Sequence, residues 1–266
     1  MLRSDSAFLL LTRIGFAARG LLYLLVAYLT VWVGRTEDAG EALAHLRSGG
    51  SVILLAAMAV GFGAYGVWRL VDAAIDTEHR GNGLKGAGIR LSHAGSGAIH
   101  LGLGFKAVRL ALGDSSARGG SSQAAEDGAA TAMTYPGGDA LLFAAAAILL
   151  AMATNQLIKA ARRRFLRHLT PAAQRKRWVI LIGVAGYAAR GVLFAVAAWL
   201  LYRATMDHAP SEAGGLGDAL TNLPGLYRNL VAAGLAMFGT YSLIEARYRI
   251  IREPHIARRV AEAARR

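Results

Sequence analysis

The chain has 266 residues, of which 55% are hydrophobic, and its 30 Lys and Arg outnumber its 17 Asp and Glu to give a net charge of +13. Its apolar residues lie in runs close to the roughly 20 that a bilayer-spanning helix needs, which excludes one or two soluble domains and indicates an all-α, polytopic membrane protein. The sequence contains no cysteine, which excludes disulfides, thiol catalysis and cysteine-ligated metals.

Six apolar segments follow one another within a single membrane domain over 1–266, and we expect six transmembrane helices. They run over about 8–33, 51–74, 89–112, 140–158, 178–202 and 226–250. A polar connection at 34–50 follows the first segment. A connection rich in Ser, Gly and Ala at 113–138 follows the third, and its composition predicts a flexible loop.

Basic residues are unevenly distributed among the connections. The amino terminus, the second and fourth connections and the tail at 251–266 hold most of them, including a dense run at 159–177. By the positive-inside rule, both termini therefore face the cytoplasm. We expect the basic residues to meet anionic lipids at that face rather than nucleic acid, and the tail to form a short helix on the membrane surface.

A short pattern recurs in the odd-numbered segments. It reads Gly-Phe-Ala-Ala-Arg-Gly at 15–20, Gly-Tyr-Ala-Ala-Arg-Gly at 186–191 and, more faintly, Ser-His-Ala-Gly-Ser-Gly at 92–97. Positions i, i+3 and i+7 share one face of a helix, so each copy presents one stripe of side chains. The three stripes are Phe16, Arg19 and Tyr23; His93, Ser96 and His100; and Tyr187, Arg190 and Phe194.

The even-numbered segments repeat as well. Gly61, Tyr65-Gly66, Trp68 and Asp72 correspond to Gly234, Phe238-Gly239, Tyr241 and Glu245. The predicted unit is a hairpin of two spans, used three times at about 8–75, 89–160 and 178–250. Because each unit crosses the membrane an even number of times, the three repeats are parallel, and we expect a pseudo-threefold axis along the membrane normal.

These motifs resemble a known family. The Arg-x-Gly-Phe-Ala-Ala-Arg-Gly opening at 13–20, its return at 186–191 and the Gly-x-x-x-Tyr-Gly-x-Trp ending at 61–68 are similar to the bacterial family catalogued as domain of unknown function 1206. The resemblance covers nearly the whole chain. It implies six spans in three two-helix repeats and a multi-pass protein of the bacterial cytoplasmic (inner) membrane, and it implies no activity. Ser96 replaces the arginine and Asn155 the tryptophan in the second repeat, so any threefold site is asymmetric.

Arg19 and Arg190 lie one to two turns inside the expected cytoplasmic boundary. A guanidinium at that depth costs about 3 kcal/mol on insertion scales and normally faces protein, water or a partner charge. In a structural interpretation, each arginine snorkels to the interface or pairs with Asp72 or Glu245 at the same leaflet. In the alternative, the stripes converge on the pseudo-threefold axis and form a cationic vestibule whose aromatic rings pack against the arginines.

His93 and His100 raise the question of a metal or a proton relay. Seven residues along a helix separate them by roughly 10 Å, too far for one ion without ligands from other helices. We expect packed, hydrogen-bonded histidines and no metal or other cofactor. A pH-sensing role is the alternative, because imidazole titrates near neutrality.

The chain has no phosphate-binding loop, nucleophile elbow, His-Glu-x-x-His pair or dense carboxylate cluster. We therefore expect no catalytic residues and no enzyme activity. Of three hypotheses for the function, an intramembrane enzyme that acts on lipid is the least favoured. The first hypothesis is a structural or regulatory protein that organises lipids or partner proteins through its basic cytoplasmic face. The second is a small channel or transporter for an anionic solute. The spans contain no proline that would break a helix at mid-membrane, which counts against this second hypothesis.

Overall fold

The computed structural model describes residues 2–34, 36, 38–75, 83–118 and 120–250, and this part of the chain is almost entirely helical. Six long helices correspond to the six predicted segments, while the predicted tail helix lies outside the described residues. The long helices are α1 (Leu2–Tyr28), continued by the π-helical turn η1 (Leu29–Val33), α3 (Val52–Ile75), α4 (Leu84–Ala111), α6 (Gly138–Ala161), α8 (Arg177–Met206) and α10 (Gly225–Tyr248). The short elements are α2 (Ala39–Ser48), η2 (Ser115–Arg118), α5 (Ser121–Met133), η3 (Arg164–His168), α7 (Pro171–Gln174), η4 (Pro210–Glu212) and α9 (Leu216–Thr221).

Four helical segments of the described chain are long and apolar enough to cross a membrane. They are Leu9–Val33, Val52–Ala74, Gly138–Ala161 and Arg177–Met206. Helices α4 and α10 are also long, with 28 and 24 residues, but they are less apolar: basic side chains and two histidines interrupt α4, and charged side chains lie within α10. Several apolar helices thus indicate a membrane-embedded protein.

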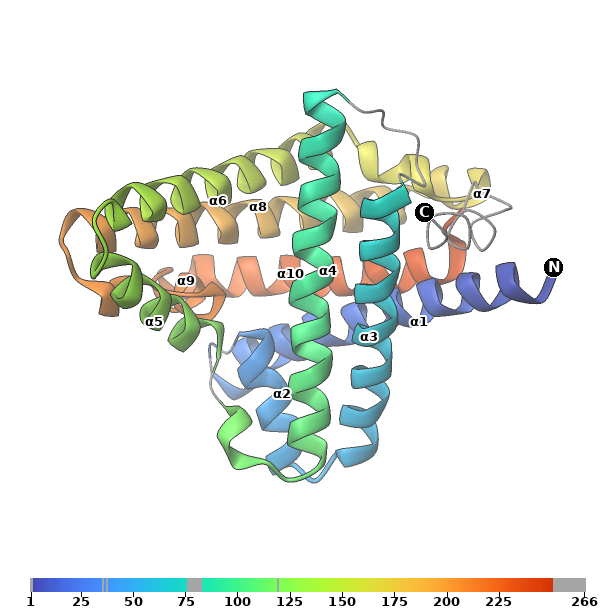
Figure 1. Ribbon diagram of the computed structural model, residues 1–266. Helices are drawn as coiled ribbons and strands as arrows, with labels where there is room; N and C mark the ends of the chain where they lie inside the picture. Colours follow the sequence, from blue (N-terminus) through green and yellow to red (C-terminus); the bar gives the residue numbers. More distant parts are fainter. Residues whose placement is uncertain (1, 35, 37, 76–82, 119, 251–266) are drawn as a thin grey trace.

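The long helices contact one another in the order α6, α8, α10, α1, α3, α4. Figure 1 shows α6, α8, α10 and α1 running side by side, with the α3–α4 pair crossing in front of them. The most extensive contacts, α3 with α4, α6 with α8 and α1 with α10, join helices of different repeats. Within the described residues α4 and α6 do not pack along each other, unlike the two long helices of the first and third repeats.

Close glycine contacts hold the helices of the first repeat together, and the third repeat copies them. A Cβ atom added to Gly15 would lie 2.7 Å from the Cβ atom of Tyr65, and one added to Gly186 would lie 2.7 Å from the Cα atom of Phe238. The equivalent position of the second repeat is Ser92. Helices α4 and α6 therefore cannot pack as closely as the helices of the first and third repeats, where glycine stands at this position.

The predicted loops at 34–50 and 113–138 both contain a helix. Asp38 caps α2: its carboxylate accepts hydrogen bonds from the backbone N–H groups of Gly40 and Glu41 at 2.6 and 3.0 Å, and the Glu41 carboxylate accepts one from the Asp38 N–H at 2.9 Å. This capping box starts a helix in a polar segment. The Asp38 carboxylate also accepts a bond from the N–H of Ser122 at 3.3 Å, which joins α2 to α5.

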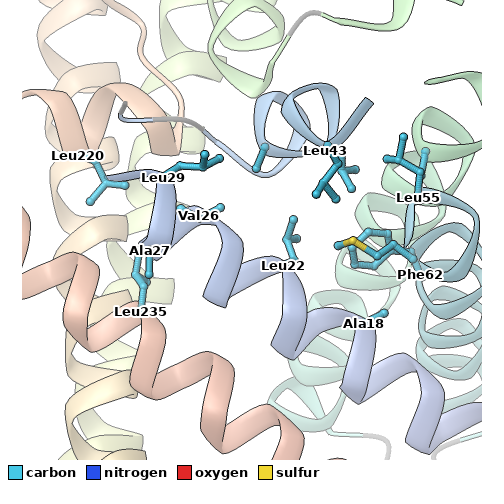
Figure 2. Close-up of a cluster of buried hydrophobic side chains, with 14 of the residues drawn as sticks. Ala18, Leu22, Val26, Ala27, Leu29, Leu43, Leu55, Phe62, Leu220 and Leu235 are labelled. Atoms are coloured by element: carbon cyan, nitrogen blue, oxygen red, sulfur yellow. The ribbon is translucent and has the colours of Figure 1, made fainter. Parts of the chain in front are cut away.

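Helix α1 lies at the centre of the largest apolar core, shown in Figure 2. Side chains of α1 meet residues from the short helices α2 and α9 as well as from α3 and α10. The labelled members are Ala18, Leu22, Val26 and Ala27 of α1, Leu29 of η1, Leu43 of α2, Leu55 and Phe62 of α3, Leu220 of α9 and Leu235 of α10. The core fixes α1 from both sides, and so fixes the stripe that α1 carries.

Candidate functional site

Arg19 is buried, with 6% of its surface exposed, and polar groups surround its guanidinium. It donates to the Glu245 carboxylate at 2.5 Å, to the Tyr65 hydroxyl at 2.9 Å and to the Ser242 hydroxyl at 3.1 Å. Glu245 also accepts a hydrogen bond from Arg249 at 2.7 Å. Arg19 therefore makes the ion pair that the structural interpretation predicts for it, across the contact between α1 and α10.

Aromatic rings enclose the same guanidinium. Its central carbon lies 4.6 Å from the centroid of the Phe16 ring, one turn away on the same stripe, and 5.1 Å from that of Phe238. Phe16 in turn packs against Tyr65 and Trp68 of α3. The ion pair is thus embedded in an aromatic layer, where cation–π contacts add to the hydrogen bonds.

Arg190 has aromatic neighbours of the same kind, but no carboxylate of the described residues pairs with it. Its guanidinium carbon lies 4.4 Å from the ring of Phe238, 5.2 Å from Phe194 of its own stripe and 5.3 Å from Tyr23 of the first stripe. Tyr187, the remaining member of the stripe, packs edge-to-face on Phe238 with the ring centroids 5.2 Å apart. The first and third stripes therefore meet around Phe238, although sequence analysis did not select that residue.

Asp72 pairs with neither stripe arginine, contrary to one of the predicted alternatives. Its carboxylate lies 2.5 Å from His93 Nδ1, on α4, and 3.7 Å from Arg69 on its own helix. Arg69 also donates to the Tyr65 hydroxyl at 3.0 Å. A carboxylate from another helix thus neighbours His93.

His100 is packed within the bundle. Its Nδ1 donates to the backbone carbonyl of Ser96, one turn earlier, at 2.7 Å, and its ring centroid lies 4.4 Å from that of Tyr65. Because Tyr65 also binds Arg19, the second stripe contacts the first through this tyrosine. All three stripes therefore approach the same interior region, where two aromatic residues of the even-numbered spans, Tyr65 and Phe238, connect them.

Several apolar helices indicate a membrane-embedded protein, and equivalent helix contacts recur along the chain. The chain belongs to the family described as Domain of Unknown Function (DUF1206), whose model matches residues 14–76, 91–163 and 185–249. These three segments confirm the resemblance and the internal repeat. The chain is also similar to the uncharacterized protein YxxB of Bacillus subtilis (strain 168), with 26% identity over 249 residues that cover 89% of each chain. No solved structure matches it significantly.

Proposed function

We propose that this protein is a non-catalytic, structural or regulatory protein of the bacterial cytoplasmic membrane, which organises anionic lipids through a basic cytoplasmic surface. In this proposal α4 and α10 cross the membrane with the four more apolar spans, the three repeats surround a pseudo-threefold axis, and both termini face the cytoplasm. At 1.5 Å per residue, α10 is about 36 Å long, enough to cross the hydrocarbon core.

The observation that carries the proposal is a cluster of exposed arginines where α6 ends. Arg162, Arg163, Arg164 and Arg167 are exposed, and no described acidic residue forms an ion pair with any of them. Each basic side chain near an anionic leaflet contributes about 1 kcal/mol of attraction. The cluster is therefore free to bind lipid headgroups.

Backbone contacts hold this basic connection in place. Thr170 N–H donates to the carbonyl of Tyr248 at 3.0 Å, and Ile250 N–H donates to that of His168 at 2.8 Å. The Tyr241 hydroxyl of α10 donates to the carbonyl of Phe165 at 2.9 Å. The arginines are thus presented on a segment fixed against α10, which supports a preformed lipid-binding surface.

Lipid selection by purified protein tests the proposal. We expect protein in nanodiscs of mixed phosphatidylglycerol and phosphatidylcholine to enrich the anionic lipid, as measured by native mass spectrometry of bound lipids. Replacing Arg162, Arg163 and Arg164 together by Gln should lower that enrichment by at least about tenfold. Arg203→Gln, at the other end of the bundle, should leave it unchanged. Equal enrichment by the triple variant and the unaltered protein would contradict the proposal.

The anionic-solute pathway of the second hypothesis requires a free cation on the path. Arg19 does not meet that requirement, because Glu245 already pairs with it in a buried site. Proteoliposome efflux of chloride or phosphate separates the two hypotheses. We expect efflux no faster than from protein-free vesicles, and an efflux that Arg190→Gln abolishes would favour the pathway instead.

A further inference from the structure

The three helix pairs that join different repeats meet at equivalent positions. In each pair, the glycine that follows the central residue of the stripe approaches the backbone of the partner helix. These close contacts are Gly20 with Gly239, Gly97 with Gly66 and Gly191 with Ala153, where an added Cβ atom would lie 2.8, 3.0 and 3.3 Å from the partner's carbonyl oxygen. The pairs α1–α10, α4–α3 and α8–α6 therefore share one register.

The same register aligns the last turns of α3, α6 and α10. These read Arg69-Leu-Val-Asp72-Ala73, Gln156-Leu-Ile-Lys159-Ala160 and Ser242-Leu-Ile-Glu245-Ala246. Lys159 thus stands where the other two repeats have a carboxylate, and Gln156 stands where α10 has Ser242. The basic run at 159–177 predicts a connection that begins at Lys159, whereas the structure places Lys159 in the last turn of α6.

The consequence is a reversal of charge between two equivalent helix pairs. In the α1–α10 pair, Arg19 meets the carboxylate of Glu245 at 2.5 Å and the hydroxyl of Ser242 at 3.1 Å. In the α8–α6 pair, the corresponding position of the stripe is Arg190, and its counterpart is a second cation, Lys159. The charge that acts most strongly on the Lys159 ammonium is that of Arg190.

No acidic side chain of the described chain pairs directly with either of these two cations. Neither Arg190 nor Lys159 forms an ion pair or hydrogen bond with a described residue, although both are partly buried. Gln156, one turn before Lys159, is only 7% exposed, and its Oε1 atom is buried without a hydrogen-bond partner. Two partly buried cations and an unsatisfied amide are unfavourable unless a ligand supplies the missing charge and hydrogen bonds.

We propose that the α6–α8 interface binds a phosphate group between Arg190 and Lys159, with Gln156 Oε1 accepting a hydrogen bond from a protonated phosphate oxygen or a lipid headgroup hydroxyl. The phosphate occupies the place that the Glu245 carboxylate holds in the α1–α10 pair. A guanidinium and an ammonium supply several charge-assisted donors, which suits phosphate oxygens. The group belongs to an anionic phospholipid or to free inorganic phosphate. This site is separate from the exposed arginines at 162–164 and does not depend on their role.

Lys159→Glu tests the site, because it rebuilds in α6 the ion pair that α10 already has. Thermal unfolding is followed by tryptophan fluorescence in detergent, with added phosphate against chloride at equal ionic strength, and with added phosphatidylglycerol against phosphatidylcholine. We expect phosphate or phosphatidylglycerol to raise the Tm of the unaltered protein by about 5 °C. Lys159→Glu should have a higher Tm without ligand, no rise with ligand, and less phosphorus bound after purification.

The two ligand arms identify the source of the phosphate. A rise with inorganic phosphate assigns a soluble anion, and a rise with phosphatidylglycerol alone assigns a lipid. Should Lys159→Glu fail to fold, Arg190→Gln should also abolish the rise, whereas Arg162→Gln on the exposed surface should retain it. The proposal is overturned if the unaltered protein shows neither a rise nor bound phosphorus. It is equally overturned if Lys159→Glu or Arg190→Gln keeps the full rise, or if Arg162→Gln loses it.

Discussion

Arg19 and Arg190 occupy the same position in their repeats, and the difference between them lies in the partner helix. Glu245 on α10 neutralises Arg19, whereas α6 offers Lys159 at the matching place. Without Arg19, Glu245 would keep its ion pair with Arg249 but lose its closest cation in a poorly solvated site, and breaking such a buried pair is strongly destabilising. Removing Arg190, which has no carboxylate partner among the described residues, breaks no ion pair and so does not destabilise the protein in this way.

Arg19→Ala should therefore cost far more stability than Arg190→Ala. We expect about 3–5 kcal/mol for Arg19→Ala, measured as the free energy of unfolding by denaturant titration in detergent micelles. In lipid-free protein, Arg190→Ala should cost less than about 1 kcal/mol, because it removes ring contacts but no ion pair. Combining Arg19→Ala with Glu245→Gln should recover part of the loss. Equal losses from the two arginine variants would refute this account of the Arg19 site.

The sequence predicts these residue pairs only where the repeat register is clear. Glu245 could be chosen as a partner of Arg19 because both belong to recurring motifs at the same leaflet. The contact of His93 with Asp72 escaped prediction, because His93 occupies the aromatic position of its stripe, where the other repeats give no reason to expect a carboxylate partner. Lys159 was missed for another reason: a lysine beside a run of arginines is typical of a connection, and only the helix contacts reveal its register.

At the level of helices, a pair of glycine contacts decides which neighbours pack. Gly61 of α3 faces Ala18 of α1, and Gly234 of α10 faces Ala189 of α8 in the same way. The equivalent residue of α6 is Ile148, whose side chain is 62% exposed. A bulky residue there, with Ser92 in place of glycine on α4, accounts for the missing contact between α4 and α6 in the described structure.

Gly61→Ala should destabilise the protein, because the new methyl group would collide with the side chain of Ala18. We expect a loss of about 1–3 kcal/mol in the free energy of unfolding, typical of overpacking at a close contact. Gly63→Ala is the matched control on the same helix: an added Cβ atom there meets nothing within 4 Å. It should leave stability unchanged or raise it slightly, by about 0.5 kcal/mol, because alanine favours the helix. Similar losses from both substitutions would show that the Ala18 contact does not limit packing.

The short helices could not be predicted from apolar periodicity. Segments 34–50 and 113–138 are polar or rich in small residues, and such composition is shared by loops and by surface helices. What makes α2 helical is its Asp38 and Glu41 capping box, a local signal that hydropathy does not register. The six long helices were predictable because apolar runs of this length have few alternatives.

For the whole molecule, the main prediction is that α4 and α10 cross the membrane. Their sequences alone do not establish this, because both are less apolar than the other long helices. Much of their polarity is compensated inside the structure. His100 and Ser242 make backbone hydrogen bonds within their own helices at 2.7 and 2.9 Å. Glu245 is neutralised by Arg19 and Arg249. A helix whose polar groups are satisfied by the protein can cross a bilayer at a lower mean hydropathy than an isolated one.

Single cysteines test this topology cleanly, because the chain has none of its own. Gly83 and Ser116 flank α4, Asn222 and Arg247 lie near the two ends of α10, and all four are exposed. In spheroplasts treated with a membrane-impermeant thiol reagent, Ser116→Cys and Asn222→Cys should be labelled at once. Gly83→Cys and Arg247→Cys should react only after the membrane is permeabilised. If both cysteines flanking one helix react from the same side, that helix does not cross, and the basic connections can no longer all face the cytoplasm.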